Sequence, residues 1–366
     1  KVGEEPVLLC AAMEREEAAA SGLRTVETSK YNIVKMIKDA GGDRLAASVN
    51  YYRAIFEEFG VTGKVAFYGR GDVGREWEFL KAIDEALPAV KVTGEFSNDL
   101  FVTARATKDE DELVRIREVG RKTCDVVRHM KEFMSSHEVT EGRLVKQDGT
   151  PLTIGDCKSE IKIGLAKRRL IEEVDTIFAI GRDAGIPHSR GRDADPIEPG
   201  KTLVFNIFPQ EEGGGYFFDM TRTFVLGSAS DEILEAYGTL EECFDTVSAT
   251  LRAGEKASVY QAATCDFFEA RGIETPRTNP RVTNGYVHSL GHGIGLEVHE
   301  KPTLSDFTGN TDALAPGSVF TFEPGLYYPD RGFGMRIEDV YYVHENGELE
   351  NLTQFPRDLV LGAGRA

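Results

Sequence analysis

The sequence has little of what disulfide-rich, membrane-spanning and nucleic-acid-binding proteins need. Its 366 residues include five cysteines, which are dispersed and never form a Cys-x-x-Cys pair, so a disulfide framework or a zinc ribbon is not expected. No stretch approaches the roughly 18 apolar residues of a membrane span. Lysine and arginine total 43 against 61 acidic residues, and the net charge of −18 argues against nucleic-acid and anionic-membrane partners.

The first residues of the sequence also show no secretory pattern. No basic stretch followed by an apolar stretch opens the sequence, and residue 1 is lysine rather than methionine, so we expect that something was removed upstream. Unpaired cysteines suit a reducing compartment. We therefore expect a cytoplasmic protein.

Histidine is scarce, and three of the seven histidines lie within residues 285–302. His288 and His292 are four residues apart, as on a zinc-protease helix, but the glycines around them make a helix costly. The run fits neither the dinucleotide fingerprint nor the second histidine of the zinc-protease motif. We predict a glycine-rich turn leading into an extended segment, from which the imidazoles converge; the alternative is a surface loop with three satisfied histidines.

Apolar spacing divides the chain near residue 107. Residues 1–106 alternate short strand-like and helix-like runs without a histidine, which predicts a small α/β domain. Thr107 to Glu110 matches a capping box before a long amphipathic helix. In residues 107–366 two helices followed by strands occur twice, which indicates two related halves. Strands are expected at 176–180, 203–208, 216–225, 319–322, 326–328 and 338–343.

Three acids occupy positions where strands should bury apolar side chains: Asp219, Glu323 and Glu338. A buried carboxylate without a partner is costly, so each needs a cation or a donor network. Arg222 and Arg336 could neutralise them as ordinary salt bridges. Carboxylates together with an imidazole instead suit Mn, Co, Fe or Zn, and we favour a metal site.

Six short motifs can be compared with known enzyme families: Ile-Pro-His188-Ser, Asp219-Met-Thr-Arg-Thr, His288-Ser-Leu-Gly-His292-Gly-Ile-Gly, His299-Glu300, Phe-Glu323-Pro-Gly and Met-Arg336-Ile-Glu338-Asp. Together they closely resemble those of the pita-bread metallopeptidases, namely the Xaa-Pro dipeptidases and aminopeptidase P enzymes, which are related to methionine aminopeptidase and creatinase. The resemblance implies an α+β chain with a creatinase-like N-terminal domain (1–106) and a C-terminal pita-bread catalytic domain (107–366).

The resemblance also implies two divalent metals held by four acids and a histidine. Asp219, His292, Glu323 and Glu338 match four of these ligands, whereas Asn206 stands where the family has aspartate. An amide offers one neutral oxygen in place of a charged carboxylate. We therefore expect one tightly held ion, with manganese favoured over cobalt, zinc or iron, and a second site that is weak or empty.

The implied activity is hydrolysis of the peptide bond before proline by a metal-bound water or hydroxide, in a short peptide and in a homodimeric enzyme. The resemblance makes Glu323 a proton shuttle, His288 and His299 substrate contacts, His188 a residue of the pocket wall and Arg336 a partner of the carboxylates. His129, His137 and His344 match no motif. Asn206 keeps a second function open, a relative that binds peptide or protein without turnover; a creatinase-like hydrolase of a small amidine is a weaker third.

Overall fold

The structure, a computed structural model, describes residues 3–96 and 100–362. They belong to two compact units, Lys1–Asp99 and Leu100–Ala366. All five cysteines are buried free thiols. Among the described residues no helix is both long and apolar enough to cross a membrane.

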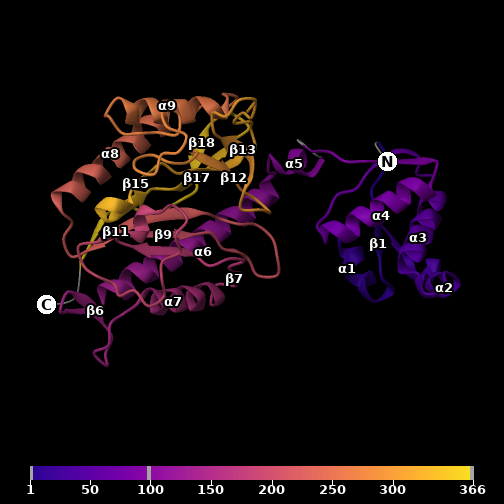
Figure 1. Ribbon diagram of the computed structural model, residues 1–366, viewed down its shortest axis with the longest axis horizontal. Coiled ribbons are helices and arrows are strands. Elements are labelled where there is room, and N and C mark those ends of the chain that lie inside the picture. Colours follow the sequence, from indigo (N-terminus) through magenta and orange to yellow (C-terminus); the bar gives the residue numbers. More distant parts are fainter. Residues whose placement is uncertain (1–2, 97–99, 363–366) are drawn as a thin grey trace. The chain divides into compact units, whose positions relative to one another are not determined.

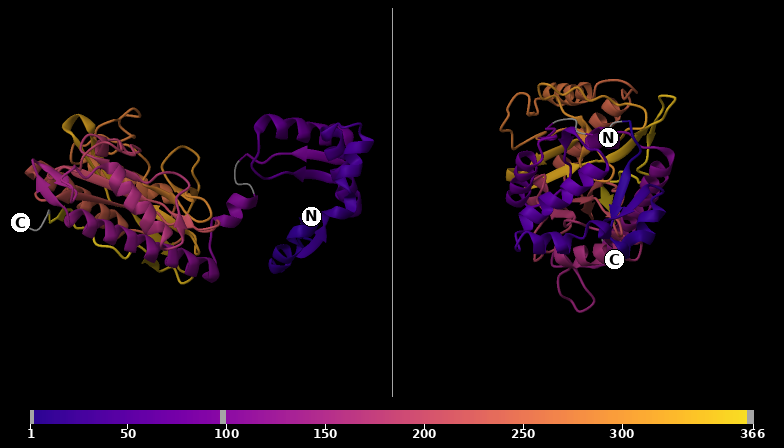
Figure 2. Two further views of the ribbon diagram at one scale, coloured as in Figure 1. Left: turned by 90° about the horizontal axis from the view of Figure 1, so that it is seen from below. Right: turned by 90° about the vertical axis from the view of Figure 1, so that its right-hand side faces the viewer.

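The first unit is a small α/β domain, in agreement with the sequence. Its helices pack around two pairs of parallel strands (Figures 1 and 2). Asp43 and Asp72 cap α3 and α4 by accepting hydrogen bonds from backbone N–H groups three residues ahead. The elements are β1 (Val7–Cys10), α1 (Arg15–Ala20), β2 (Arg24–Glu27), α2 (Ile33–Asp39), α3 (Arg44–Glu58), β3 (Gly63–Ala66), α4 (Val73–Ala86) and β4 (Val90–Thr93).

The second unit repeats the order of two long helices followed by strands, as predicted. Its first half contains α5 (Leu100–Arg105), α6 (Glu110–Ser135), β5 (Glu138–Thr140), β6 (Arg143–Val145), α7 (Ile154–Ala166), β7 (Leu170–Ile171), β8 (Ile177–Ile180), β9 (Thr202–Ile207), β10 (Gln210–Glu211) and β11 (Met220–Leu226). Its second half contains α8 (Asp231–Ser248), α9 (Ala257–Glu269), β12 (Gly291–Gly293), β13 (Glu300–Leu304), β14 (Val319–Phe322), β15 (Gly325–Tyr328), β16 (Phe333–Arg336), β17 (Asp339–Val343), β18 (Leu349–Asn351) and β19 (Val360–Leu361).

Two sheets lie between two layers of helices. The sheet β19-β11-β9-β8 shares one apolar core with α6 and α7, whereas the sheet β13-β12-β14-β17-β18 shares a second core with α8 and α9. Figure 1 and the right view of Figure 2 show α9 and α7 on opposite sides of the strands. Polar side chains on the inner strands are thereby enclosed from both sides.

The two sheets meet at one backbone pair. Thr221 and Glu338 exchange hydrogen bonds between their main chains, with N···O distances of 3.4 and 3.1 Å. Gly120 lets α6 approach this region closely, because a Cβ there would lie 2.4 Å from the ring of Phe218. This junction brings the acid of each half toward the centre of the unit.

Two local predictions were wrong. The long helix is capped by Asp109, which forms a complete capping box with Glu112, so the helix begins later than the Thr107 box implied. Residues 296–299, expected to be extended, form bends, because Glu300 Oε1 accepts a hydrogen bond from Glu297 N and closes the chain on itself.

Candidate metal centre

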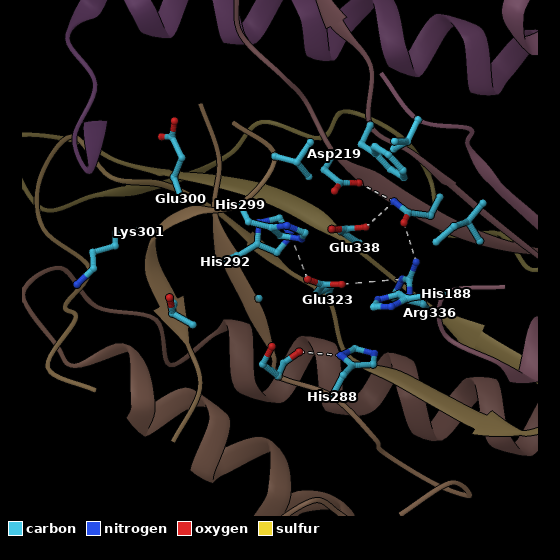
Figure 3. Close-up of a pocket in the computed structure, with 18 of the residues that line it drawn as sticks. His188, Asp219, His288, His292, His299, Glu300, Lys301, Glu323, Arg336 and Glu338 are labelled. Atoms are coloured by element: carbon cyan, nitrogen blue, oxygen red, sulfur yellow. Dashed lines mark hydrogen bonds and ion pairs between the residues drawn. The ribbon is translucent and has the colours of Figure 1, made fainter. Parts of the chain in front are cut away.

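The site lies where the two sheets meet, and each of its polar side chains comes from the end or interior of a strand. Asn206 is on β9, Asp219 directly precedes β11, and His292 is on β12. Glu323 follows β14, whereas Arg336 and Glu338 flank the turn between β16 and β17. Together with His188, His288 and His299 they line a cavity of about 830 Å³ (Figure 3).

Ligand atoms of Asp219, His292 and Glu338 all lie within 4.8 Å of one another. Glu323 belongs to the same cluster, because its Oε1 lies 3.4 Å from His292 Nε2. Burial raises the pKa of Asp219, Glu323 and Glu338, and their mutual repulsion adds to the increase for Asp219 and Glu323. The carboxylates therefore need positive charge between them to stay ionised.

His292 is oriented with one nitrogen free for a cation. Burial, followed by the neighbouring His299, lowers the pKa of His292 to about 3, so the ring is neutral. Its Nδ1 lies 3.0 Å from Gly293 O, which accepts only, so Nδ1 carries the proton and Nε2 a lone pair. That lone pair faces the Glu323 carboxylate. Two acceptors at this separation require a proton or a metal ion between them.

An oxygen of Glu338 also indicates a bound cation. Glu338 Oε1 is buried and has no hydrogen-bond partner in the part of the chain that the structure describes. Such orphaned buried oxygens are rare and need an explanation. A divalent cation bound by Glu338, Asp219, Glu323 and His292 Nε2 would satisfy it, so the residues present fit one metal ion.

Asn206 is bonded on both sides of its amide. Its Nδ2 donates to Asp219 Oδ1 at 2.5 Å and to Glu338 Oε2 at 3.1 Å, while its Oδ1 accepts from Arg336 Nη2 at 2.8 Å. Because a guanidinium only donates and carboxylates only accept, this amide orientation follows from its neighbours. To coordinate a metal through oxygen, Asn206 would have to turn its amide over and break these contacts.

Arg222 and Arg336, which the sequence offered as salt-bridge partners of the three acids, have different partners in the structure. Arg222 pairs with Asp339 at 2.8 Å and donates to backbone carbonyls, so it does not neutralise the three acids. Arg336 lies among them, 4.0 Å from Glu323 Oε2, and donates from Nε to Thr221 Oγ1, which itself donates to Glu338 Oε2 at 2.6 Å. One guanidinium therefore faces three carboxylates.

Tyr327 is a residue of the site that the sequence did not reveal. Its hydroxyl accepts from Arg336 Nη1 at 3.0 Å and lies 2.9 Å from His288 Nε2. Burial lowers the pKa of His288 to about 3 and raises that of Tyr327 to about 12, so the hydroxyl donates to a neutral imidazole. His288 Nδ1 is bonded to Ser289 O, so both ring nitrogens are engaged within the protein.

The remaining histidines separate into two groups. His188 and His299 line the cavity with exposed rings, and the His299 ring packs edge-on against His292 at 4.3 Å between centroids. His129, His137 and His344 do not line it, and each contacts a nearby acid or carbonyl. Thr221 and Tyr327 were not singled out in the sequence, because their contacts with Glu338 and His288 join segments that are 117 and 39 residues apart.

Residues 114–345 match the model of metallopeptidase family M24, and the chain belongs to this family. It is 30% identical to an Xaa-Pro dipeptidase of Lactobacillus delbrueckii subsp. lactis over 354 residues, which cover 94% of this chain and 82% of the relative. It is 28% identical to the probable dipeptidase PepE of Mycobacterium tuberculosis (strain ATCC 25618 / H37Rv) over 273 residues. That match covers 75% of this chain and spans 65% of the relative's length.

Solved structures show the same fold. The X-Pro aminopeptidase of Thermotoga maritima MSB8 superposes with a TM-score of 0.75 at 23% identity, covering 98% of this chain and 88% of that one. The prolidase of Pyrococcus furiosus gives 0.72 at 24% identity, with 97% and 89% covered. The expected pita-bread fold and the resemblance to the Xaa-Pro peptidases are thus confirmed.

Proposed function

We propose that this chain is a metal-dependent exopeptidase that hydrolyses the peptide bond before proline in short peptides. The observation that carries the proposal is the cluster in which one ligand atom each of Asp219, His292 and Glu338 lies within 4.8 Å of the others, while Glu338 Oε1 lacks a partner among the described residues. This cluster lies in the wall of a cavity large enough for a short peptide. Relatives named dipeptidase and aminopeptidase support the same reaction class.

Charge supports a site for a single divalent ion. Asp219, Glu323 and Glu338 contribute three negative charges when ionised, and Arg336 contributes one positive charge. One divalent cation brings this sum to neutrality, whereas two would leave a buried excess of positive charge. The Asn206 amide, which donates hydrogen bonds to both Asp219 and Glu338, also favours a single metal ion.

A divalent ion at this position would polarise a carbonyl group and acidify a water molecule. Glu323 is placed to carry the proton released in hydrolysis, because burial raises its pKa and Thr321 Oγ1 holds its Oε1 at 3.3 Å. Tyr327 and Arg336 fix His288 beside the cavity. His299 is left to contact the substrate, since its ring has no hydrogen-bond partner among the described residues.

The cavity wall also suits a proline-containing substrate. One part of it is apolar, formed by Val102, Val174, Ile177, Phe208 and Val298. An apolar wall favours a pyrrolidine ring over a charged side chain. The proposed substrates include both dipeptides and longer peptides.

The test is hydrolysis of an Xaa-Pro dipeptide and an Xaa-Pro tripeptide by the chain with Mn²⁺ or Co²⁺. We expect turnover that chelation removes and that His292→Ala abolishes together with metal binding. His344→Ala is the matched control, because His344 lies outside the cavity and pairs with Glu350 at 2.8 Å. Metal retained by His292→Ala would contradict the ligand assignment.

A second candidate is a peptide-binding protein without turnover. Asn206 favours it, because its N–H groups engage the Asp219 and Glu338 oxygens that a metal needs. Binding of an Xaa-Pro peptide without hydrolysis, in the presence of saturating metal, would support this candidate over the peptidase.

We also propose manganese as the preferred ion, and a homodimer in the cytoplasm as the working form. Carboxylates with one imidazole suit Mn²⁺, and buried free thiols suit a reducing compartment. Val73 and Trp77, one turn apart on α4 and 84% and 64% exposed, leave apolar area for a second copy. Light scattering that finds only monomer would contradict the dimer.

A further inference from the structure

A buried ion pair lies beside the cluster and has no role in the function proposed above. Lys108 Nζ lies 2.7 Å from Glu300 Oε2, and the two side chains are 1% and 5% exposed. Lys108 precedes the cap of α6, whereas Glu300 begins β13 directly after His299. The pair therefore joins the start of α6 to residues 294–300, which we call the His299 loop. Figure 3 labels Glu300 and His299 in this loop.

The pair is built into this loop. Glu300 Oε1 accepts from Glu297 N at 3.1 Å, and Lys108 Nζ also donates to Arg105 O at 2.7 Å. Gly295 leaves the necessary room, because a Cβ there would lie 2.5 Å from Glu300 Oε2 and 2.7 Å from Lys108 Cε. The two charged groups thus clamp the backbone on both sides of His299.

His299 depends on that backbone for its direction. Among the described residues its imidazole has no hydrogen-bond partner, and its ring packs edge-on against His292. The other cavity histidines differ, since His288 and His292 are each fixed by a bond to a backbone carbonyl. Movement of the His299 loop would move this ring without opposition from a bond of its own.

Stability does not account for the ion pair. Burial lowers the pKa of Lys108 even though Glu300 opposes the change, so removal from water outweighs the attraction. Buried pairs of this kind are often replaced by neutral side chains without loss of stability. Fixing the geometry of a neighbouring group is the benefit that remains.

We infer that Lys108 and Glu300 are positioning residues that hold His299 against His292 and toward the substrate. The catalytic consequence rests on the proposed peptidase function. A displacement of about 1 Å in a substrate-contacting group can reduce turnover up to roughly 100-fold. The pair would therefore act on kcat through His299, because the Glu300 carboxylate is engaged by Lys108 and by Glu297 N.

The test replaces both charges at once, because either single change leaves an unpaired buried charge. In Lys108→Met/Glu300→Gln we expect kcat to fall roughly 10- to 100-fold, with the melting temperature, KM and Mn²⁺ affinity nearly unchanged. Lys108→Arg, which keeps the charge, should retain most of the turnover. The matched control is Arg117→Met/Glu350→Gln, which removes an ion pair of 2.5 Å that also starts from α6, is about one-third exposed and lies outside the cavity lining, and should leave kcat unchanged. An unchanged kcat in the first double variant would overturn the inference.

Histidine ring NMR provides a test that does not need turnover. The His299 signal, identified by its loss in His299→Gln, should be single and sharp in the unaltered chain and broadened or doubled in Lys108→Met/Glu300→Gln. An identical His299 signal in both proteins would overturn the positioning role. Absence of Xaa-Pro hydrolysis by the unaltered chain would instead reject the proposed function and leave this test in place.

Discussion

Asn206 Nδ2 lies 2.5 Å from Asp219 Oδ1 and donates a hydrogen bond to it. The same nitrogen donates to Glu338 Oε2 at 3.1 Å, so one amide joins the acids of the two halves. Arg336 holds the amide oxygen from the other side. In this arrangement a neutral amide does part of what a second cation would do, which is to offset repulsion between two carboxylates.

Asn206→Asp should convert the site to one that holds two ions. The added carboxylate keeps the contact with Arg336 but replaces two donated hydrogen bonds with repulsion, which a second cation relieves. We expect bound Mn²⁺ to rise from about one toward two per chain, and Xaa-Pro hydrolysis to increase. Asn346→Asp is the control, because Asn346 is exposed and its Oδ1 already serves as an acceptor. Unchanged metal content and activity in Asn206→Asp would point to a non-catalytic role.

Arg336→Met should destabilise the metal-free chain more than the metal-loaded chain. Arg336 is the guanidinium that faces the three acids, and removing one partner of a buried charge costs about 3–5 kcal/mol of unfolding free energy. A bound divalent ion supplies the missing positive charge, so added Mn²⁺ should recover much of the loss in thermal unfolding. Arg331→Met, which removes a half-exposed pair with Glu232, should change little. An equal loss of stability in Arg336→Met with and without Mn²⁺ would contradict the idea that Arg336 and the metal neutralise the same three acids.

Tyr327→Phe should lower kcat/KM roughly tenfold while leaving metal binding intact. The hydroxyl connects Arg336 to His288, and losing a buried hydrogen bond of this kind costs about 1–1.5 kcal/mol. Steady-state kinetics and a metal titration on the same preparation provide the measurement. Loss of the metal itself would show that Tyr327 supports the ligands instead.

The stabilisation given by metal should grow as pH rises. In the folded chain without metal, the pKa values of Asp219, Glu323 and Glu338 lie above their unfolded values near 4. The folded state therefore holds more protons, and these groups make the unfolding free energy fall as pH increases from about 4 through the raised values. A bound metal ion keeps these carboxylates ionised in the folded state, so it removes this fall in the unfolding free energy. The increase in melting temperature on adding Mn²⁺ should be larger at neutral pH than at mildly acidic pH; an increase independent of pH would count against the account.

The sequence predicted the fold well where apolar periodicity was strong. Helices α6, α8 and α9 and strands β9, β11, β14 and β17 lie close to the predicted ranges, because their buried faces repeat at helical or strand spacing. The bends of the His299 loop were missed because they depend on Glu300, whose partner Lys108 lies 192 residues away in the chain. Local patterns do not contain such a contact.

The sequence likewise revealed some residues of the candidate site and missed others. Asp219, Glu323, Glu338 and His292 stood out because charged and imidazole groups occurred within apolar or glycine-rich runs, and the structure brings them together. Tyr327 did not stand out among 12 tyrosines, since nothing in its neighbourhood marks a hydroxyl that bonds Arg336 and His288. The turned amide of Asn206 likewise required the positions of its three neighbours.

The most direct test of the central claim is a calorimetric titration of the metal-free chain with Mn²⁺, with bound metal counted by mass spectrometry. One divalent ion together with Arg336 neutralises the three acids. Asn206 donates hydrogen bonds to the Asp219 and Glu338 oxygens that a second ion would need. The account predicts one tight site per chain and at most a much weaker second one. Two equally tight sites, or none, would contradict it.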